Sequence, residues 1–464
     1  MNIVWFRGDL RLSDNPALSY ASQRGAVLPI FILDSKIGAA SKLWLHHSLE
    51  SLDKSLRGRL NIYNGDAKSI LSQLIKENPI TGVYWNRRYD CKGISDDAEI
   101  KSFINSLGIE CKSFNGSLLW EPWEVLKSDK TPYKVFTPYY RNGCLKTSPP
   151  RAPLQTPSNI EIAGKISNLS VEELKLKTSL PWGKNVMSQW KVGEDAAKEK
   201  LTKFIDNSLI GYKENRNFPS KTATSFLSIH LHFGEISPNQ IWYYSDIKSL
   251  SAIHANDLDF FRSELGWREF SHYLLYHFPE LPEKNFQPKF DDFPWEYNDK
   301  HYKAWTKGMT GYPIIDAGMR ELWQTGYMHN RVRMIVASFL IKNLLIDWRK
   351  GAEWFWETLL DADIANNSAS WQWVAGSGAD AAPYFRIFNP ITQSEKFDPN
   401  GEYIRRFIPE LAKLPTKYIF APWDAPDTIL KNSGITFGES YPAPIIDLSA
   451  SREKALKLYK NMPI

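Results

Sequence analysis

Short apolar runs alternate with amphipathic stretches along the first 130 residues of the chain. The apolar runs predict five strands, at residues 2–6, 26–33, 60–63, 82–85 and 108–114. The amphipathic stretches predict helices at residues 15–23, 42–57, 67–76 and 95–106. Because strand and helix alternate, we expect a Rossmann-like α/β domain with a parallel sheet covered on both faces.

Polar residues and a glycine mark where some of these helices begin and end. Ser41 and Asp66 are suited to cap helix N-termini, because a short side-chain oxygen can accept a hydrogen bond from a first-turn amide. Gly58 is suited to end the second helix, since glycine readily adopts the left-handed conformation that follows many helices.

The periodicity weakens from residue 131 to residue 194, where prolines interrupt the chain repeatedly and predict an interdomain linker. Beyond it the chain is predicted to be helical, most clearly at residues 331–346. There Val332, Ile335, Val336, Phe339 and Leu340 follow helical spacing. We therefore expect an α/β domain at 1–130, the linker at 131–194, and an all-α domain at 195–464.

Composition and charge narrow the class of protein. Cys91, Cys111 and Cys144 lie far apart with no CxxC pair, which argues against a disulfide framework and a structural zinc site. The longest apolar run, residues 26–33, is far shorter than the roughly 20 residues of a membrane span. We expect a cytoplasmic protein. The net charge of +5 tolerates a phosphate-bearing partner without requiring one.

Common catalytic templates are missing from the sequence. No GxGxxG or GxxxxGK[ST] follows a predicted strand, and no GxSxG elbow occurs. His46 and His47 are expected to point apart on a helix, so that they cannot hold one ion together. His230 and His232 are expected in the core or on the surface. We expect no metal site.

Three segments are more polar than a helical core requires: residues 260–270, 327–334 and 361–373. On a helix, Glu264, Trp267 and Arg268 share one face, although a surface Glu264–Arg268 pair beside a core indole explains them equally well. Asn330 and Met334 lie one turn apart. The third segment crowds acids, amides and indoles into thirteen residues, which suggests a bound ligand.

Several motifs in this order resemble the DNA photolyase and cryptochrome family. They are IVWFRGDLRLSDNPAL near the start, TGYPIIDAGMR at 310–320, MHNRVRMIVASFL at 328–340 and WQWVAGSGADAAPYFRIFNPITQSEKFD at 371–398. The chain is most similar to the family's bacterial cyclobutane pyrimidine dimer photolyases, in a subgroup close to plant cryptochromes. The resemblance implies an antenna domain, a helical FAD-binding domain and a cavity for a pyrimidine dimer.

Carried over residue by residue, the family pattern assigns flavin contacts. The positions that match the FAD pyrophosphate loop are Tyr212, Thr224, Ser225, Leu227 and Ser228. The positions that match contacts to the rest of the flavin are Phe261, Arg268, Arg333, Asp361 and Asp363, with Arg333 expected to pair with Asp361. Asn367 matches the group that faces the central ring nitrogen. Plant-type cryptochromes usually carry Asp there, so Asn367 favours repair over signalling.

The family pattern also assigns a lesion pocket and an electron relay. The pocket positions are Glu264, Trp267, Asn330, Met334 and Trp373, and the positions that match phosphate contacts are Arg216 and Arg331. The relay that reduces oxidised flavin from the surface matches Trp371, Trp348 and Trp295, with Trp354 and Trp356 as an alternative branch. The (6-4) photolyases have a histidine pair here, whereas residues 328–330 follow the cyclobutane-type pattern.

The antenna segments are residues 44–47 and 85–90, which resemble those of relatives that carry 5,10-methenyltetrahydrofolate. Gly93 stands where better-known folate binders have glutamate, so a deazaflavin or an empty antenna site stays open. The resemblance implies light-driven repair of dimer-containing DNA by a bacterial, monomeric enzyme that associates with the nucleoid when bound to DNA. The alternatives are a blue-light-sensing cryptochrome and a DNA-binding flavoprotein without repair activity.

Overall fold

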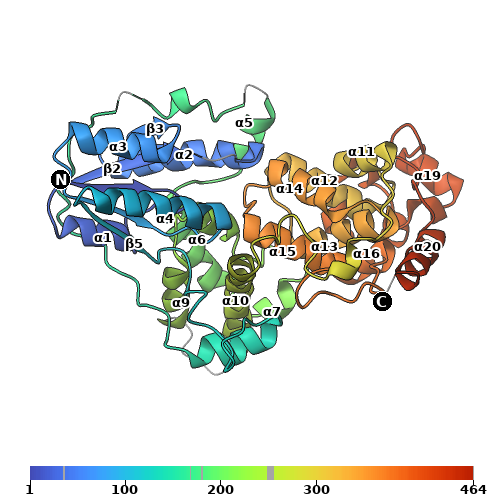
Figure 1. Ribbon diagram of the computed structural model, residues 1–464. Coiled ribbons are helices and arrows are strands. Elements are labelled where there is room, and N and C mark those ends of the chain that lie inside the picture. Colours follow the sequence, from blue (N-terminus) through green and yellow to red (C-terminus); the bar gives the residue numbers. More distant parts are fainter. Residues whose placement is uncertain (35–36, 168, 179–180, 248–254, 463–464) are drawn as a thin grey trace. The chain divides into compact units, whose positions relative to one another are not determined.

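The structure is a computed structural model that describes residues 1–464 except 35–36, 168, 179–180, 248–254 and 463–464. Contacts divide the chain into two compact units (Figure 1). Unit 1 comprises Met1–Tyr212 and Thr224–Pro279, and unit 2 comprises Lys213–Ala223 and Glu280–Ile464. Unit 1 contains a parallel sheet and unit 2 is helical, which confirms the predicted fold class.

The sheet of unit 1 has five parallel strands in the order β3-β2-β1-β4-β5. The strands are β1 (Asn2–Phe6), β2 (Val27–Leu33), β3 (Asn61–Asn64), β4 (Gly82–Asn86) and β5 (Glu110–Phe114). Each lies within two residues of its predicted bounds. Strands β1 and β4 are buried on both faces, as expected of apolar runs in a parallel sheet.

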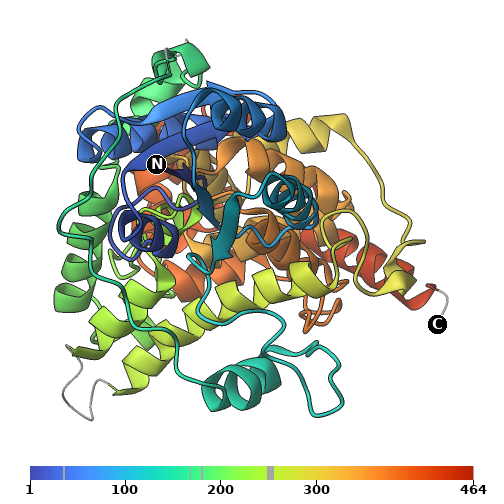
Figure 2. The same cartoon turned by 60° about the vertical axis from the view of Figure 1, so that its left-hand side comes forward.

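Helices lie on both sides of this sheet (Figure 2). Helices α3 and α4 pack their apolar residues on one face, and α1 contacts β1, β4 and β5. The helices of unit 1 are α1 (Pro16–Ser22), α2 (Ala39–Ser55), α3 (Ala67–Glu77), α4 (Cys91–Ser106), η1 (Pro138–Gly143), η2 (Cys144–Lys146), η3 (Glu172–Leu174), α5 (Pro181–Met187), α6 (Glu194–Asn207), α8 (Ser228–His232), α9 (Pro238–Ile247) and α10 (Ala255–His277).

Some of the predicted helix ends are confirmed and one is wrong. Asp66 caps α3 as predicted, because its carboxylate accepts from Ser69 N at 2.8 Å. The cap predicted at Ser41 is wrong, since α2 begins at Ala39 and Ser41 is buried within its first turn. Gly58 follows α2 with φ of 72°, the left-handed conformation expected of a residue that ends a helix.

Residues after the predicted linker belong partly to unit 1. Trp44 Nε1 donates to Glu235 Oε1 at 3.0 Å, and Leu119 N donates to Glu269 Oε2 at 2.8 Å. Such bonds join α10 and the segment between α8 and α9 to the sheet half of the chain. The division by contacts therefore does not coincide with the predicted boundary at residue 195, because these long-range bonds leave no mark on local periodicity.

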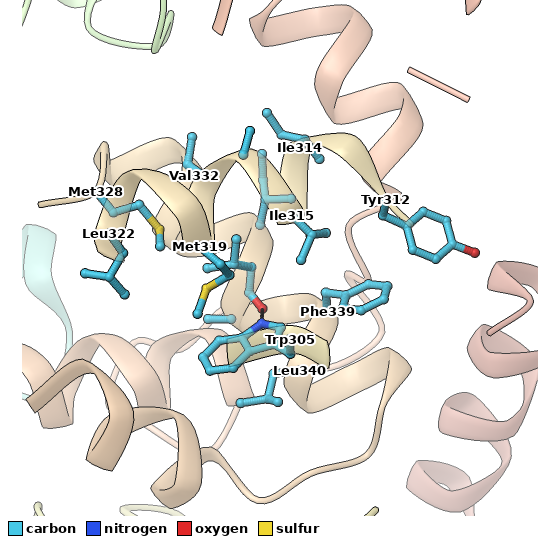
Figure 3. Packing of buried hydrophobic residues seen from close by; sticks show 14 of the residues in the cluster. Trp305, Tyr312, Ile314, Ile315, Met319, Leu322, Met328, Val332, Phe339 and Leu340 are labelled. Atoms are coloured by element: carbon cyan, nitrogen blue, oxygen red, sulfur yellow. Dashed lines mark hydrogen bonds between the residues drawn. The ribbon is translucent and has the colours of Figure 1, made fainter. Parts of the chain in front are cut away.

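Unit 2 has a large apolar core around Trp305 (Figure 3). The indole Nε1 donates to Val336 O at 3.0 Å, so this buried polar group is satisfied. The helices wholly within unit 2 are η4 (Pro288–Phe290), α11 (Asp299–Lys307), α12 (Pro313–Thr325), α13 (Asn330–Ser338), η5 (Phe339–Asn343), α14 (Trp348–Thr358), α15 (Ile364–Ala375), α16 (Pro390–Phe397), α17 (Glu402–Phe407), η6 (Pro409–Leu411), α18 (Thr416–Ile419), η7 (Pro422–Asp424), α19 (Asp427–Ser433) and α20 (Leu448–Lys460). The short α7 (Tyr212–Asn215) spans the border between the units.

The helix predicted at residues 331–346 is not continuous. Helix α13 ends at Ser338, and the chain widens into the π-helical turn η5 over Phe339–Asn343. Leu345 then adopts a left-handed conformation with φ of 55°. The apolar spacing predicted the buried face correctly, but the spacing alone does not reveal where the backbone changes its hydrogen-bond pattern.

Two expectations from composition can be compared with the structure. Cys91 is an exposed thiol, while Cys111 and Cys144 are buried thiols, and none of them forms a disulfide. Burial raises the pKa of both buried thiols to about 12. Over the described residues, no helix combines the length and apolar character needed to cross a membrane.

Candidate functional site

The loop before α8 has the features of an anion-binding loop. Thr224 Oγ1 is buried and makes no hydrogen bond to any described residue, and Phe226 has a φ of 53° that non-glycine residues rarely adopt. The N-cap of α8 is Leu227, whose side chain cannot accept a hydrogen bond, so the loop hydroxyls are not helix caps. Ser228 is exposed at the first position of α8.

The amides at the start of helix α8 contribute little to this loop. Helix α8 has five residues, too few for a substantial helix dipole. Ser225 Oγ accepts from Leu227 N at 3.4 Å, which is a local turn contact. The buried hydroxyl of Thr224 is therefore the strongest feature of the loop.

Tyr212 and Phe261, two predicted flavin contacts, lie together in unit 1. Their rings meet edge to face at 5.6 Å, and Phe204 lies 4.7 Å from Phe261. Both Tyr212 and Phe261 are buried. The structure thus brings these two positions into one aromatic cluster. Such a cluster is expected both of the wall of a cofactor site and of an ordinary apolar core.

Arg268 on α10 has a different carboxylate partner from the one considered from sequence. Its Nη1 lies 3.2 Å from Glu269 Oε1 and donates to Ser117 O at 2.8 Å. Glu269 is buried and accepts from Leu119 N, and its burial raises the pKa of its carboxyl to about 7. Glu269 was missed because helical spacing places residue 264, not residue 269, on the face of Arg268.

Trp267 and Glu264 are both half-buried on α10. The Trp267 ring stacks on Phe136 with centroids 3.8 Å apart and planes 11° apart. One face of the indole is therefore covered within unit 1. The predicted role of Trp267 as a pocket wall can use only its remaining surface.

Arg333 and Asp361 form the predicted ion pair in unit 2. Arg333 Nη2 donates to Asp361 Oδ2 at 2.9 Å, and Arg333 Nε donates to Met328 O at 2.7 Å. The Asp361 side chain is only 5% exposed, so the two charges interact in a weakly screened environment. The pairing is confirmed, while its place beside a flavin stays a prediction.

The amide of Asn367 on α15 is oriented by a hydrogen bond. Its Nδ2 donates to Ala352 O at 3.0 Å, so the carbonyl Oδ1 is the atom suited to accept a hydrogen bond from a ligand. Asp363, by contrast, is the N-cap of α15, and its Oδ1 accepts from Asn366 N at 2.8 Å. This structural role alone accounts for an acid at position 363.

Three arginines surround a buried histidine in unit 2. His329 Nδ1 accepts from Arg331 N at 3.2 Å and caps α13. Burial, followed by the charges of Arg216, Arg331 and Arg333, lowers the pKa of His329 to about 3. Arg331 Nη2 donates to Asn217 Oδ1 at 2.6 Å. The two predicted phosphate contacts therefore lie in one positively charged neighbourhood.

The other predicted lesion contacts of unit 2 lie on α13 and α15. Asn330 is the exposed first residue of α13, and Met334 is half-buried one turn later. The Sδ of Met334 lies 3.8 Å from Arg331 Nη1. Trp373 is half-buried on α15. The one-turn relation of Asn330 and Met334 is confirmed.

The predicted relay tryptophans share one apolar cluster of unit 2. Trp371 and Trp348 are buried in it, and the half-buried Trp295 packs against it. Trp348 Nε1 donates to Asn285 Oδ1 at 2.9 Å. Burial therefore decreases from the first two indoles to the third, as a relay from interior to surface requires.

The alternative branch also reaches the surface. Trp354 and Trp356 are half-buried and pack against the same cluster. The Trp354 ring stacks with that of Trp323 at a centroid distance of 6.1 Å, and Trp323 is 48% exposed. Trp323 was not singled out from the sequence, because nothing in its local pattern separates it from a surface residue.

Comparisons with known proteins identify the family. The protein-family model described as DNA photolyase matches residues 2–158. The family model described as FAD binding domain of DNA photolyase matches residues 260–461. The deoxyribodipyrimidine photo-lyase of Agrobacterium fabrum is 52% identical over 98% of this chain and 97% of its own length. This chain belongs to the DNA photolyase family.

The chain is similar both to proteins named cryptochrome and to proteins named photolyase. Cryptochrome-1 of Arabidopsis thaliana is 37% identical over 99% of this chain and 70% of its own length. The crystal structure of a bacterial class III photolyase from Agrobacterium tumefaciens has a TM-score of 0.95 at 50% identity, covering 99% of this chain and 97% of that one. The predicted family, a photolyase-type enzyme and an FAD-binding domain are thereby confirmed.

The segments that resemble photolyase antenna sites are tightly packed in unit 1. Trp85 is buried and its Nε1 donates to Asp97 Oδ2 at 2.8 Å. A methyl group added at Gly93 would lie 2.6 Å from Asp90 Oδ2 and 2.7 Å from Arg88 Cβ. A glutamate therefore cannot replace Gly93 without movement of its neighbours.

The hydrogen bonds of three buried polar residues in this photolyase-family chain could not be predicted from the sequence. Tyr403 donates to Glu321 Oε2 at 2.6 Å, and burial raises the pKa of Glu321 to about 7. Gln372 Nε2 donates to Leu281 O at 2.7 Å and to Lys284 O at 2.8 Å. Their partners are distant in sequence, so only the folded chain identifies them.

The expected orientation of His46 and His47 is wrong, while the expectation of no metal site stays a prediction. His46 and His47 were expected to point apart, yet His46 Nε2 lies 3.3 Å from Glu50 Oε1 and His47 Nδ1 lies 2.8 Å from Glu50 Oε2. Glu50 lies three and four residues after the histidines, so it meets both on the helix surface. The expectation overlooked this shared carboxylate.

Proposed function

We propose that this chain repairs cyclobutane pyrimidine dimers in DNA by light-driven electron transfer from reduced FAD to a flipped-out dimer. When bound, reduced FAD supplies the electron that splits the dimer, and the electron then returns. The observation that favours a repair function over a signalling function is the orientation of the Asn367 amide, which leaves Oδ1 available to accept a hydrogen bond. A carboxylate there would repel an anionic flavin, whereas a neutral amide does not.

The residues present fit the diphosphate and the ring of FAD. The buried hydroxyl of Thr224 lacks a partner among the described residues and can donate to a phosphate oxygen. Tyr212, Ser225, Leu227 and Ser228 complete this proposed loop contact. Arg333, paired with Asp361, holds a positive charge in a fixed position where a reduced flavin carries negative charge.

The proposed lesion contacts combine apolar walls with hydrogen-bonding groups. Trp267 and Trp373 offer indole surface, and Glu264 and Asn330 can bond the edges of the flipped bases. Met334 adds a polarisable apolar contact on α13. Flipping costs least at a damaged, poorly stacked site, so such contacts select the dimer.

Arg216 and Arg331 are proposed to bind the phosphates that flank the lesion. Their charges both lower the pKa of His329, so they lie close enough to act together. Phosphate contacts contribute affinity without reading the sequence of the DNA. His329 stays neutral at physiological pH and therefore does not add to the positive field.

The proposed relay carries electrons to oxidised flavin through Trp371, Trp348 and Trp295. Support comes from their common apolar cluster and from the half-buried position of Trp295. The branch through Trp354 and exposed Trp323 is the competing route. The two routes use different surface indoles, so single substitutions can distinguish them.

The antenna, the oligomeric state and the location of the protein are further parts of this proposal. We propose 5,10-methenyltetrahydrofolate as the antenna, held in unit 1 near residues 85–90, which include Arg87 and Arg88. The cationic side chains there suit an anionic folate. We also propose a monomer that works in the bacterial cytoplasm on nucleoid DNA.

The decisive experiment is a light-dependent repair assay on a duplex with one cyclobutane dimer, using protein whose absorption spectrum shows bound flavin. We expect repair under blue light and none in the dark. Flavin binding without repair would favour a blue-light-sensing cryptochrome. A parallel duplex with a (6-4) lesion tests the dimer type, and absorbance beyond that of flavin identifies the antenna.

An Asn367→Asp variant tests the observation that carries the proposal. A new negative charge near the flavin should make its reduction harder, by about 30 mV for each 1.4 kcal/mol of repulsion in a two-electron couple. Asn367→Ser is the matched control, because it removes the amide without adding charge. Equal midpoint potentials in the two variants would show that position 367 does not face the flavin.

A further inference from the structure

A cluster of two histidines and two glutamates lies in unit 1, apart from every residue predicted to contact flavin or DNA, and its histidines belong to the antenna segment at residues 44–47. His46, His47 and Glu50 are on α2. Glu172 belongs to η3, in the segment that was expected to be an irregular linker. The cluster therefore joins a helix of the sheet domain to a distant part of the chain.

The potential ligand atoms of these residues lie close to one another. His46 Nε2 lies 3.3 Å from Glu50 Oε1 and 3.5 Å from Glu172 Oε1. His47 Nδ1 lies 2.8 Å from Glu50 Oε2, and the potential ligand atoms of the α2 residues all lie within 4.8 Å of one another. Two imidazoles and the Glu50 carboxylate thus face the same small volume, and the Glu172 carboxylate reaches the His46 side of it.

His46 is buried in an unusual way. Its side chain is 1% exposed, yet neither ring nitrogen makes a hydrogen bond to a described residue. A buried polar group without a partner costs about 1–3 kcal/mol, so most buried histidines have one. The Nε2 atom is aimed at the two carboxylates, which indicates that a cation is the partner this histidine is placed for.

Two of the separations match the edges of a metal tetrahedron. Zn²⁺ binds histidine nitrogen and carboxylate oxygen at about 2.0–2.2 Å, so the ligand atoms of a tetrahedral site lie roughly 3.3–3.6 Å apart. The distances from His46 Nε2 to Glu50 and Glu172, 3.3 and 3.5 Å, fall in this range. His47 Nδ1, at 2.8 Å from Glu50 Oε2, would withdraw slightly on metal binding, and Glu172 would close toward the other α2 ligands.

We propose that His46, His47, Glu50 and Glu172 form a binding site for a zinc-like divalent cation. The site uses two neutral imidazole nitrogens and two carboxylate oxygens, a ligand set that zinc accepts. Four protein ligands close the coordination sphere, so the ion has a structural role. It fastens the segment around η3 to α2.

A lysine competes with the cation for one carboxylate of this cluster. The competitor for Glu172 is Lys177, whose Nζ lies 3.1 Å away in an exposed and screened pair.

The test is a zinc titration of the full chain, with any affinity tag removed, metals stripped by a chelator, and thiols kept reduced by a phosphine. We expect one equivalent to bind. Glu50→Gln and Glu172→Gln should each weaken zinc binding by at least about tenfold, because each removes a charged ligand. Glu99→Gln, an exposed glutamate of α4 paired with Lys68, is the matched control and should bind as the original chain does.

Glu172→Gln keeps the test conclusive even if variants of buried His46 fold poorly, since Glu172 is 62% exposed. Cobalt provides a second readout, because tetrahedral Co²⁺ absorbs strongly in the visible region and should do so only when the four ligands are intact. Failure of the original chain to bind zinc would overturn the proposal. Equal binding by all variants would overturn it too, by showing that the ion sits elsewhere, for example at the exposed thiol of Cys91.

Discussion

Replacing Gly351 with alanine should disturb the position of Trp371, the first indole of the proposed relay. Gly351 lies on α14 directly against the Trp371 ring. An added methyl carbon would lie 2.1 Å from Cη2, 2.4 Å from Cζ3 and 2.7 Å from Cζ2 of that ring. Carbon atoms normally approach to about 3.5–4.0 Å, so the ring or the helix must move by more than about 1 Å.

Two opposing effects set the size of the change in stability. Alanine favours a helix over glycine by about 1 kcal/mol, and alone it would stabilise α14. Overpacking a filled core costs about 1–3 kcal/mol. The upper part of that range applies, because Phe355 lies 4.9 Å from the Trp371 ring and Trp305 lies 6.3 Å from it, and both limit its escape. We expect Gly351→Ala to lower the free energy of unfolding by about 1–2 kcal/mol.

A Trp371→Phe background provides the matched control for this expectation. Phenylalanine lacks the outer indole ring that carries the three clashing atoms, so Gly351→Ala should be neutral or stabilising there. The four proteins of this double-mutant cycle are compared by urea unfolding, followed by circular dichroism. Because the chain has two compact units, the transitions of each are fitted separately.

The outcome can contradict the reasoning in two ways. Gly351→Ala could leave the protein as stable as the original chain, which would mean that the Trp371 ring does not rest on α14. It could also destabilise both backgrounds equally, which would place the clash on some other neighbour. Either result would remove the structural basis for treating Trp371 as a rigidly held relay residue.

Three further predictions concern electron supply, DNA binding and pH. Trp371→Phe should slow photoreduction of oxidised flavin, measured by absorbance under blue light, and an unchanged rate would point to the Trp354 branch. Glu264→Ala should weaken binding to dimer-containing DNA by about 1–3 kcal/mol and leave binding to undamaged DNA unchanged. Arg216→Ala should weaken binding to both DNAs. It should also reduce the salt dependence of the binding constant by the equivalent of about one phosphate contact. Because burial raises the folded-state pKa of Glu321 to about 7, its stability contribution should fall as pH rises from about 4.5 to 7. Glu321→Gln should flatten this decline in thermal unfolding, and an equally steep decline would exclude Glu321 as its source.

The local features of the chain were readable from the sequence. Five strands lie within two residues of their predicted bounds, because short apolar runs mark strands that are buried in a parallel sheet. Asp66 was recognised as a cap because its hydrogen bond to Ser69 spans only three residues. The motifs that resemble photolyases were equally visible, since they are contiguous, and the comparisons confirm the family.

The partners of charged and polar groups were decided only by the tertiary structure. Arg268 was considered with Glu264 from helical spacing, but its carboxylate contact is Glu269, which the backbone of residues 119–120 also holds. A hydroxyl residue shortly before a helix, such as Thr224, is often its cap, but the structure shows that Leu227 occupies that position. In both cases the deciding atoms lie outside any pattern of short-range spacing.

The cluster at His46 shows the same limit most clearly. The sequence determined that His46, His47 and Glu50 lie on one helix, because their spacing is local. It carried no sign that Glu172, far along a segment with little periodicity, would meet them. A periodic pattern of apolar residues shows which face of an element is buried, because burial depends on the general surroundings. A set of metal ligands depends on which individual atoms folding brings together. Sequence therefore determined the elements and the family of this protein, and the tertiary structure decided which side chains act together.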